Sequence, residues 1–469
     1  MNASFAKHID ELRAAVPSLE ILTDEASCRS RGRDTWVRSL MKSRLGDVPA
    51  PGAVLKPHDT EEVSQCLSWA QDTETVLVPF GLGSGVCGAV LMEQDQVVLD
   101  MSEMDQILDI DETSLTVTVQ PGMRGSDFEE ALAARGFTMG HWPQSIALSS
   151  VGGWVATRAS GQFSTLYGNI EEMFLGCEVV MAGGRTMRIP VVPRSATGPD
   201  LRALFMGSEG TLGVLTEVTF RIHRAPEKQI GLAVSFDGLT AGSEALREIV
   251  QAGWTPAVTR LYDVVEAGRN FSGVAETDRP VLLILGEGNA ERVTTEAAGI
   301  ATICSRHGGK SHGEAPVLSW LDHRNNVPTF ESLLDQGILA DTIEVAIDWS
   351  QLITLWDNVC AAGNAREDVL AMSGHVSHCY TQGANIYFTF ISAEKDLERA
   401  LATYDAVWDT TMRITHEMGG TIAHHHGIGR VRRRWLGEEL GTATELLRTL
   451  KSALDPKGIL NPGALIPSD

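Results

Sequence analysis

The sequence predicts a protein of the α+β class with two or three domains. Its 469 residues are too many for one ordinary hydrophobic core. Short β-branched stretches alternate with helical patterns over the first third of the chain. Near Pro226 a second series of alternating strand and helix patterns begins. We therefore expect a first domain over residues 1–225 and a second, mixed domain over 226–415. Residues 416–469 then form a C-terminal segment.

Short apolar runs indicate the strands of the first domain. They lie at 75–79, 97–101, 115–119 and 214–222. A helix is expected over 127–135, where Phe128 and Leu132 stand at helical spacing and Gly136 follows as a C-cap. Residues 191–199 are rich in Pro, Ser and Gly and predict a long loop.

The second domain shows the same two kinds of pattern. Strands are expected at 231–236, 281–285 and 387–391. Helices are expected at 242–252, 291–307 and 393–418, and a further helix at 446–454 in the C-terminal segment.

Charge and cysteine usage exclude several functional classes. Lys and Arg number 38 against 61 Asp and Glu, a net charge of -23 that repels phosphate backbones and anionic lipids. No apolar run is long enough for an integral membrane segment, and the N-terminus lacks the order of a signal peptide. The seven cysteines are scattered without a CxxC pair. We expect a reduced, cytoplasmic protein that does not bind nucleic acid.

A glycine-rich loop follows the first of these strands. Residues 79–88 contain four glycines, and glycine lets successive backbone N–H groups converge on a phosphate-sized group. The alternative is a tight turn between strands. The loop lacks the lysine of a P-loop, and the segment after it is no clear Rossmann helix.

Two further small-residue segments favour a cofactor site over a simple turn. Residues 143–161 are nearly uncharged and rich in Ser and Gly, as expected where the backbone approaches a large flat ligand. Residues 207–214 form a further glycine-rich turn that leads into a predicted strand. Three such loops in one domain are hard to explain as turns alone.

The three loops and the closing segment 455–463 resemble the vanillyl-alcohol oxidase type of FAD-binding flavoproteins (FAD-linked oxidase type 4). Within this type the chain is most similar to bacterial alkylglycerone-phosphate synthase-like proteins. That likeness rests on residues 154–162, 193–196, 377–380 and 424–427. The resemblance spans roughly residues 54–465 and implies a two-part FAD-binding domain with an inserted α+β cap domain.

The resemblance also implies that FAD is the cofactor and which residues bind it. They are Pro79, Gly81, Gly83, Ser84, Gly85, Pro143, Ser145, Ser149, Thr157, Ser160, Glu209, Gly210 and Val214. Relatives that attach FAD covalently often use a histidine in or near the first loop. No histidine lies between Thr60 and Gly140, so we expect noncovalent FAD.

The expected catalytic residues lie near three consecutive histidines. His424, His425 and His426 stand between apolar residues inside a globular region, which argues against a histidine tag. Tyr380 matches the tyrosine that the synthases use as proton donor and acceptor, and nearby histidines could share its proton. Arg260 matches a functionally important arginine of the family. The alternatives are a Tyr380 packed under a strand and an Arg260 in a surface salt bridge.

A metal site is the competing interpretation of the histidines. Metal-dependent 2-hydroxyacid dehydrogenases place a glutamate where this chain has His425, and two histidines in a glycine-aspartate turn. Here His375 is followed by no such turn. We predict that the protein binds no metal. If it does bind one, His375 and His425 are the candidate ligands.

The substrate pocket is expected to include Phe330 and His378. By resemblance, Phe330 stands where the synthases carry an arginine for the substrate phosphate. Phenylalanine cannot donate to a phosphate, and Glu331 would repel one. Arg324 could take over that role.

The sequence therefore predicts an FAD-dependent oxidoreductase that oxidises a small hydroxylated or amino substrate by hydride transfer to the flavin. Tyr380, assisted by His425 or His426, would take the proton. The alternatives are the non-redox alkylglycerone-phosphate synthase reaction, a metal-assisted D-2-hydroxyacid dehydrogenase, and a flavin-binding protein without catalysis. The electron acceptor (oxygen or another) stays open, as does a homodimer.

Overall fold

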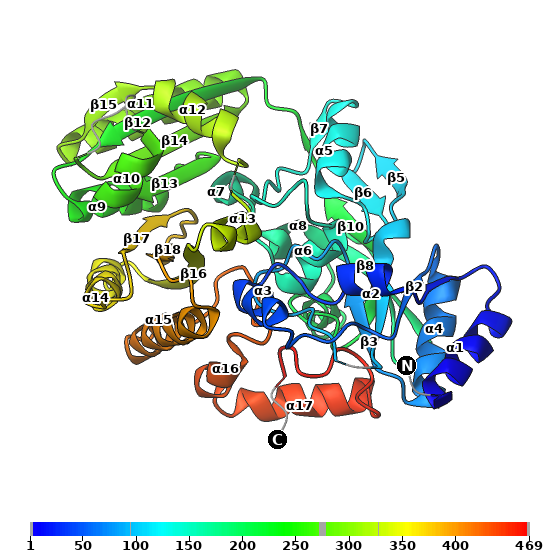
Figure 1. The fold of residues 1–469 in the computed structure, drawn as a ribbon. Helices are drawn as coiled ribbons and strands as arrows, with labels where there is room; N and C mark the ends of the chain where they lie inside the picture. Colours follow the sequence, from blue (N-terminus) through cyan, green and yellow to red (C-terminus); the bar gives the residue numbers. More distant parts are fainter. Residues whose placement is uncertain (1–2, 94, 272–277, 327, 467–469) are drawn as a thin grey trace.

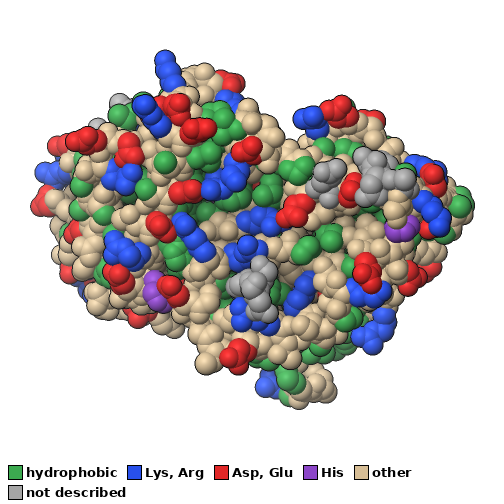
Figure 2. Space-filling view, turned by 60° about the horizontal axis from the view of Figure 1, so that its bottom comes forward, with side chains coloured by type: hydrophobic (Ala, Val, Ile, Leu, Met, Phe, Trp, Pro, Cys, Tyr) green, Lys and Arg blue, Asp and Glu red, His purple; other side chains and the backbone are tan. Residues whose placement is uncertain are grey.

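The computed structural model describes residues 3–93, 95–271, 278–326 and 328–466. The described residues form two larger sheets and a two-stranded one in the N-terminal half, and a seven-stranded sheet in a separate lobe at the upper left of Figure 1. The α+β prediction is confirmed, because antiparallel sheets dominate and the helices pack on their faces. Charged side chains of both signs are interspersed on the face in Figure 2, and hydrophobic groups form small separate patches there.

The first sheet has the order β1-β2-β4-β3, and β2, β4 and β3 are parallel. Its strands are β1 (Glu20–Leu22), β2 (Ala53–Lys56), β3 (Leu77–Phe80) and β4 (Val97–Asp100). Helices in this part of the chain are α1 (Ala3–Ala15), α2 (Glu25–Ser30), α3 (Val37–Arg44) and α4 (Thr60–Thr73), with a 3₁₀ turn η1 (Met101–Glu103) after β4. Val97, Val98 and Leu99 of β4 are fully buried, so the centre of the sheet belongs to the core.

The second sheet is antiparallel, with the order β5-β6-β10-β8-β9. Its strands are β5 (Ile107–Asp111), β6 (Thr116–Val119), β8 (Phe174–Val180), β9 (Thr186–Ile189) and β10 (Val214–Arg221). Its helices are α5 (Gly125–Ala133), α6 (Val151–Thr157), α7 (Ser164–Tyr167), α8 (Ile170–Met173) and the 3₁₀ turn η2 (Leu201–Leu204). A two-stranded ribbon joins β7 (Phe137–Thr138) to β11 (His223–Arg224). The expected loop at 191–199 has no helix or strand.

The seven-stranded sheet is antiparallel throughout, with the order β15-β12-β14-β13-β17-β18-β16. Its strands are β12 (Lys228–Ser235), β13 (Val258–Tyr262), β14 (Val281–Gly288), β15 (Lys310–Gly313), β16 (Leu339–Asp348), β17 (Ala371–Val376) and β18 (Gly383–Ser392). The helices of this lobe are α9 (Leu239–Gln251), α10 (Val264–Phe271), α11 (Ala290–Arg306), α12 (Ala315–His323), α13 (Phe330–Asp335) and α14 (Leu352–Asn364).

Three helices follow: the first packs against the lobe of the seven-stranded sheet, and the other two run along the bottom of Figure 1 toward the N-terminal sheets. They are α15 (Leu397–Glu417), α16 (Arg433–Leu440) and α17 (Ala443–Leu454). The helix expected from residue 393 begins later because the carboxylate of Asp396 caps it, accepting hydrogen bonds from the N–H groups of Glu398 and Arg399. After α17, residues beside Leu460 run along β3, where Leu77 N–H donates to Ile459 O at 2.8 Å.

Candidate functional site

The glycine-rich loop leaves β3 with its backbone donors free. Gly83 has a φ of +69°, which favours glycine. Within the described part of the chain, no N–H group of Gly81–Gly85 donates a hydrogen bond to another residue. A Cβ at Gly81 would clash with the hydroxyl of Ser150 on the neighbouring loop. The loop is therefore a cradle of unpaired N–H donors suited to an anionic group.

The second predicted loop leads into α6. Ser150 caps this helix, and its hydroxyl accepts from the N–H of Gly153. Ser149 receives a hydrogen bond from Trp154 Nε1 at 2.8 Å and donates to Ser145 O at 2.9 Å. The Thr157 hydroxyl donates to Gly153 O. These hydroxyl contacts fix the shape of the loop.

The side chain of Glu209, which was expected at the FAD site, binds backbone N–H groups of the C-terminal segment. Its buried carboxylate accepts from the N–H of Ile428 at 2.6 Å and from the N–H of Gly429 at 2.9 and 3.0 Å. Burial raises its pKa to about 7, although these two donors oppose the shift. Glu209 therefore holds the segment after the three histidines. Gly210 packs on Pro79, and Val214 begins β10.

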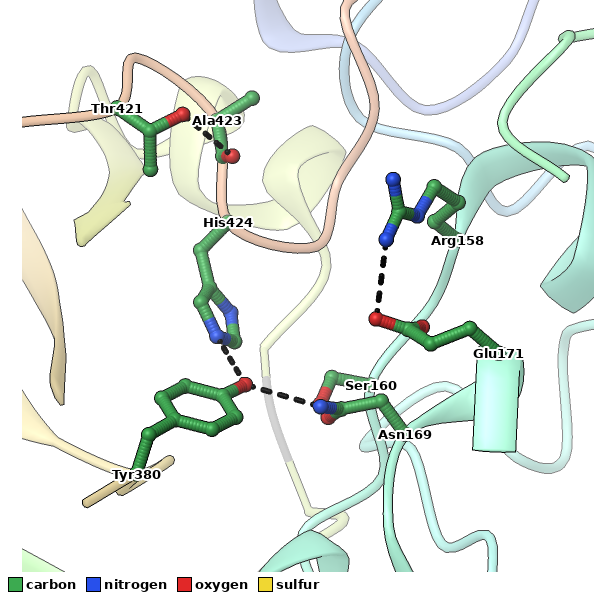
Figure 3. Close-up of a pocket in the computed structure, with 8 residues that line it drawn as sticks. All are labelled: Arg158, Ser160, Asn169, Glu171, Tyr380, Thr421, Ala423 and His424. Atoms are coloured by element: carbon green, nitrogen blue, oxygen red, sulfur yellow. Dashed lines mark hydrogen bonds and ion pairs between the residues drawn. The ribbon is translucent and has the colours of Figure 1, made fainter. Parts of the chain in front are cut away.

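Tyr380 and His424 meet in a cavity between the two lobes (Figure 3). The Tyr380 hydroxyl lies 2.7 Å from His424 Nε2 and accepts from Asn169 Nδ2 at 3.0 Å. The other ring nitrogen of His424, Nδ1, lies 2.8 Å from His425 Nδ1. Burial raises the pKa of Tyr380 well above its usual range and lowers that of His424 to about 4. At neutral pH a protonated phenol therefore faces a neutral imidazole that connects it to a second one.

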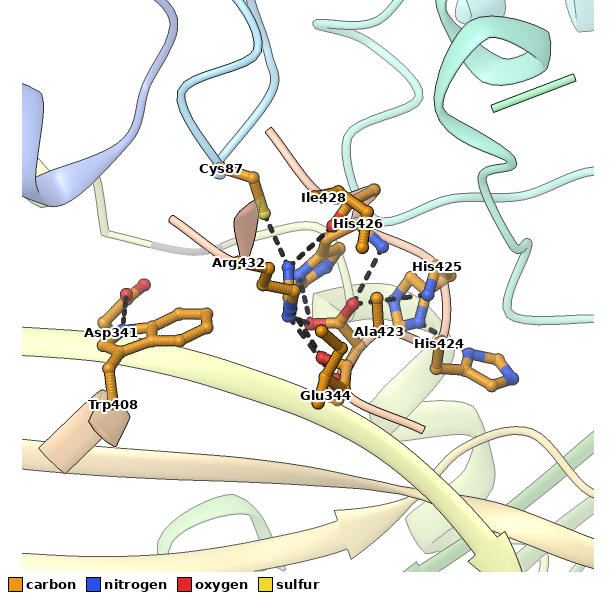
Figure 4. A network of polar contacts seen from close by, with 12 residues as sticks. Cys87, Asp341, Glu344, Trp408, Ala423, His424, His425, His426, Ile428 and Arg432 are labelled. Carbon is orange, nitrogen blue, oxygen red and sulfur yellow. Dashed lines mark hydrogen bonds and ion pairs between the residues drawn. The ribbon is translucent and has the colours of Figure 1, made fainter. Parts of the chain in front are cut away.

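A buried ion pair holds the backbone of the three histidines in place (Figure 4). Glu344 and Arg432 are both fully buried and paired with each other. Glu344 also accepts from the N–H of His426 at 2.9 Å, and its carboxylate lies 2.9 Å from His426 Nδ1. Burial would raise the pKa of Glu344, but Arg432 and His426 hold it well below the usual range. Glu344 is thus an ionised anchor for the backbone of the histidine segment.

Arg260 is buried and is not part of a surface salt bridge. Its Nη2 lies 2.6 Å from His375 Nε2, and its Nε donates to the Tyr262 hydroxyl at 2.8 Å. The second ring nitrogen of His375 lies 2.7 Å from the buried carboxylate of Glu266. Both ring nitrogens of His375 are therefore occupied by protein groups. The arrangement holds Arg260 in a fixed position on β13.

His378 lies against His424, whereas Phe330 lies away from Tyr380 and the three histidines. The His378 ring stacks on His424 with centroids 4.9 Å apart, and its Nδ1 lies 2.7 Å from Ser164 Oγ and 3.1 Å from Ser160 Oγ. Phe330 begins α13 and packs at the edge of the core under the seven-stranded sheet. It lines neither described cavity beside Tyr380.

Arg324 lies in an aromatic enclosure. Its guanidinium carbon lies 5.4, 5.6 and 5.7 Å from the ring centroids of Phe163, Trp320 and Trp142. No carboxylate forms an ion pair with it among the described residues, and its buried Nε has no hydrogen-bond partner. Arg260 also lies over Trp320, at 5.3 Å. The two arginines thus approach the same indole ring from separate elements.

Comparison with known families accounts for nearly the whole chain. Residues 51–190 match the family described as the FAD binding domain, and residues 225–465 match the C-terminal domain of FAD linked oxidases. The chain belongs to the FAD-linked oxidases. FAD is accordingly the cofactor of this oxidoreductase.

Curated relatives of this FAD-linked oxidase include proteins with different activities. The uncharacterized FAD-linked oxidoreductase YgcU of Escherichia coli (strain K12) is 33% identical over 485 residues, covering 100% of this chain and 99% of the relative. The alkyldihydroxyacetonephosphate synthase of Dictyostelium discoideum is 30% identical, covering 99% of this chain and 81% of the relative. A solved alkyldihydroxyacetonephosphate synthase has a TM-score of 0.83 at 26% identity, covering 97% of this chain and 84% of that one. The family resemblance expected from the sequence is confirmed.

The residues of this FAD-linked oxidase fit the cofactor that the family implies. The free N–H groups of Gly81–Gly85 suit the pyrophosphate. His141 adds an observation that sequence reasoning missed. It is fully buried beside Trp154, and neither ring nitrogen has a partner in the structure. The sequence signal for His141 is its position, because it comes directly before Trp142 and Pro143 at the start of the second predicted cofactor loop.

Asn169 and Glu344 are the other residues that sequence reasoning missed. Asn169 follows Tyr167-Gly168 outside the small-residue segments and carried no local signal of its contact with Tyr380. Glu344 interrupts an apolar strand between Ile343 and Val345, and a lone acid in such a run indicates a buried partner. No helix among the described residues is long and apolar enough to cross a membrane.

The pKa of His424 predicts an acid-dependent loss of stability. An unfolded histidine titrates near 6.5, and the buried ring titrates near 4, so between these values the unfolded chain binds a proton that the folded chain does not. The free energy of unfolding should therefore fall as the pH falls from about 6.5 to about 4. Urea unfolding of His424→Gln across this range should show a slope smaller by about one proton, about 1.4 kcal/mol per pH unit. Equal slopes for both proteins would show that His424 is not held neutral by burial.

A chelator should leave the activity of this FAD-linked oxidase unchanged. Ring nitrogens of His378, His424 and His425 lie within 4.8 Å of one another, close enough to consider a metal ion. However, both ring nitrogens of His424 already face Tyr380 and His425, and His375 faces Glu266 and Arg260. We expect dialysis against EDTA, with metal content measured before and after, to leave turnover within experimental error. Loss of activity that zinc restores would contradict this expectation.

Proposed function

We propose that this FAD-linked oxidase oxidises a small hydroxylated or amino compound, with Tyr380 as the group that receives the substrate proton. The observation that carries the proposal is the hydrogen-bonded chain from the Tyr380 hydroxyl through His424 to His425. The proposed organisation is an FAD-binding domain over residues 1–225, a cap over 226–415 and a returning segment over 416–469, with FAD bound noncovalently.

The chain of three side chains can move a proton without leaving a charge on the phenol. When bound, FAD supplies a two-electron acceptor for the hydride of the substrate C–H bond. As Tyr380 takes the substrate O–H proton, its own proton passes to His424 Nε2. His424 then releases its Nδ1 proton to His425 Nδ1, which lies 2.8 Å away. Each of the first two groups gains one proton and loses one, so the high pKa of Tyr380 is no obstacle.

Asn169 and the buried anchors support this role by orientation. Asn169 Nδ2 donates to the phenol oxygen, so the phenol proton is directed to His424. Because Glu344 and Glu209 bind the backbone on both sides of the histidines, the imidazoles do not need to reorganise during the transfer. Arg260 is proposed to act by positioning, through its contacts with His375 and Tyr262, because neither Arg260 nor Arg324 lines a described cavity beside Tyr380.

The synthase reaction is the second candidate, supported by the relatives of that name and by a TM-score of 0.83. Against it, Phe330 at the phosphate-binding position packs into a core edge and offers no donor. A metal-assisted D-2-hydroxyacid dehydrogenase is the third candidate, since a probable D-lactate dehydrogenase of Danio rerio is 27% identical. The occupied ring nitrogens of His375 argue against it.

Anaerobic reduction of the flavin tests the proposal. Alcohols, hydroxyacids and amines are added to the oxidised holoenzyme under nitrogen, and the loss of the yellow flavin absorbance is followed. At least one class should bleach the flavin, and oxygen or an added dye should restore it. An oxidised flavin across the whole panel, together with turnover of acyl-dihydroxyacetone phosphate and a fatty alcohol, would establish the synthase reaction instead.

A further inference from the structure

Two cavities meet at Tyr380. The smaller cavity, of about 170 Å³, is lined by Arg158 and His424 among others (Figure 3). The larger, of about 540 Å³, lies under α7 and reaches Arg221 at the end of β10. Both are lined by Asn169, Glu171 and Tyr380, so the larger cavity opens onto the proposed proton acceptor. We call the larger cavity the polar chamber.

The polar chamber is separate from the residues expected to hold FAD. The smaller cavity includes Ser160, which belongs to the predicted cofactor set. No residue of that set lines the polar chamber. The chamber therefore stays available for the substrate when the cofactor is bound.

The lining of the polar chamber is unusual for a small-molecule site. Such sites are mostly apolar, with a few polar groups that orient the ligand. Here four charged residues, Glu171, Glu172, Arg202 and Arg221, line the cavity together with Ser and Thr residues, and Arg221 is the one of the four without an ion pair or side-chain hydrogen bond in the described chain. Leu166 is the aliphatic exception among its described lining residues. An alkyl chain in this space would displace water from charged groups without replacing its hydrogen bonds.

We infer that the substrate is a small polyhydroxylated compound, of the sugar-alcohol class, that reaches Tyr380 through the polar chamber. This inference rests on the proposed function and names its substrate class. Each hydroxyl of such a compound can both donate and accept, which suits a lining of carboxylates, guanidinium groups and hydroxyls. One carbinol carbon loses a hydride to the bound flavin, its hydroxyl proton goes to Tyr380, and the product is the corresponding carbonyl compound.

Matched pairs of equal carbon number test this inference on the holoenzyme. Erythritol is compared with 1-butanol and ribitol with 1-pentanol, and the anaerobic rate of flavin reduction is measured at equal concentrations. Each polyol should reduce the flavin at least about tenfold faster than its partner, the effect of one to two net hydrogen bonds. Alkanols that react as fast as the polyols would overturn the inference but leave the proposed function standing.

A flavin that stays oxidised with both series, and also with the hydroxyacids and amines of the first panel, contradicts the proposed function. Binding of polyols and alkanols to the oxidised holoenzyme then tests the polar chamber. Perturbation of the oxidised flavin spectrum by polyols and not by alkanols would support the chamber. Equal perturbation, or none, would overturn it. The two proposals can therefore fail separately.

Arg221 supplies a matched pair of variants. Arg221 is exposed, lines the chamber and forms no ion pair in the described chain, whereas Arg224 is also exposed but does not line the chamber. Arg221→Leu should raise the KM for the polyols about tenfold with a smaller effect on kcat, as loss of a charged hydrogen bond predicts. Arg224→Leu should leave both constants unchanged. Equal effects of the two substitutions would contradict a role of the chamber in substrate binding.

Discussion

Replacing Tyr380 by Phe should leave FAD bound and lower the rate of flavin reduction by about 10²–10⁴-fold, the usual contribution of a general acid–base group. Phe keeps the ring but removes the hydroxyl that lies 2.7 Å from His424 and 3.0 Å from Asn169. The substrate proton then has no acceptor in direct line with the imidazoles. Stopped-flow absorbance under nitrogen measures the rate, and the flavin content of the purified variant measures cofactor binding.

A second tyrosine provides the control for this substitution. Tyr262 is buried, and its hydroxyl accepts from Arg260 at 2.8 Å, but it does not contact the three histidines. Tyr262→Phe should therefore retain most of the reduction rate. A Tyr380→Phe enzyme that keeps near-normal rates would refute the proposed role of Tyr380.

Replacing Glu344 by Ala should lower the free energy of unfolding by about 3–5 kcal/mol, because it leaves a buried arginine without its counterion. Glu344 and Arg432 are both fully buried, and the Arg432 guanidinium also lies 4.9 Å from the ring of Trp408. The substitution also frees the backbone of His425 and His426. Urea unfolding followed by circular dichroism measures the loss, and the rate of flavin reduction reports the displaced histidines.

Glu417→Ala is the control for the unfolding measurement. Glu417 pairs with Arg413 at 3.2 Å on α15, and both side chains are 59% exposed. Exposed pairs of this kind contribute less than about 1 kcal/mol. If Glu344→Ala cost no more than Glu417→Ala, the buried pair would not anchor the histidine segment.

Local sequence patterns predicted the elements and the reactive segment well, because each depends on neighbouring residues. Alternating apolar runs predicted β3, β4, β10 and β14, with ends that differ by only a few residues. The glycines at 81–85 predicted the cradle, since only a glycine-rich backbone can present its N–H groups in this way. The pairing of Tyr380 with the three histidines came from family resemblance and agrees with the observed 2.7 Å contact to His424.

Contacts between distant segments could not be predicted in this way. Glu209 was assigned to the cofactor, yet its carboxylate binds residues some 220 positions later. Trp36 was expected in the first domain, but its indole donates to Tyr404 on α15 and its helix packs against the core of the seven-stranded sheet. Phe330 was assigned to the substrate pocket and packs at that core. Such pairings depend on the folded arrangement of whole elements, which no local period encodes.

The strand-like contact of the C-terminal segment with β3 has a consequence for biosynthesis. A ribosome releases residues 1–225 long before Ile459 exists, and until then the edge of β3 beside the glycine cradle lacks its last partner. Glu209 likewise waits for the N–H groups of Ile428 and Gly429. The glycine cradle and Glu209 thus lack these contacts until residues 428–460 have been made, and we expect the loops to take their final form, and to bind the flavin, only after that point in synthesis.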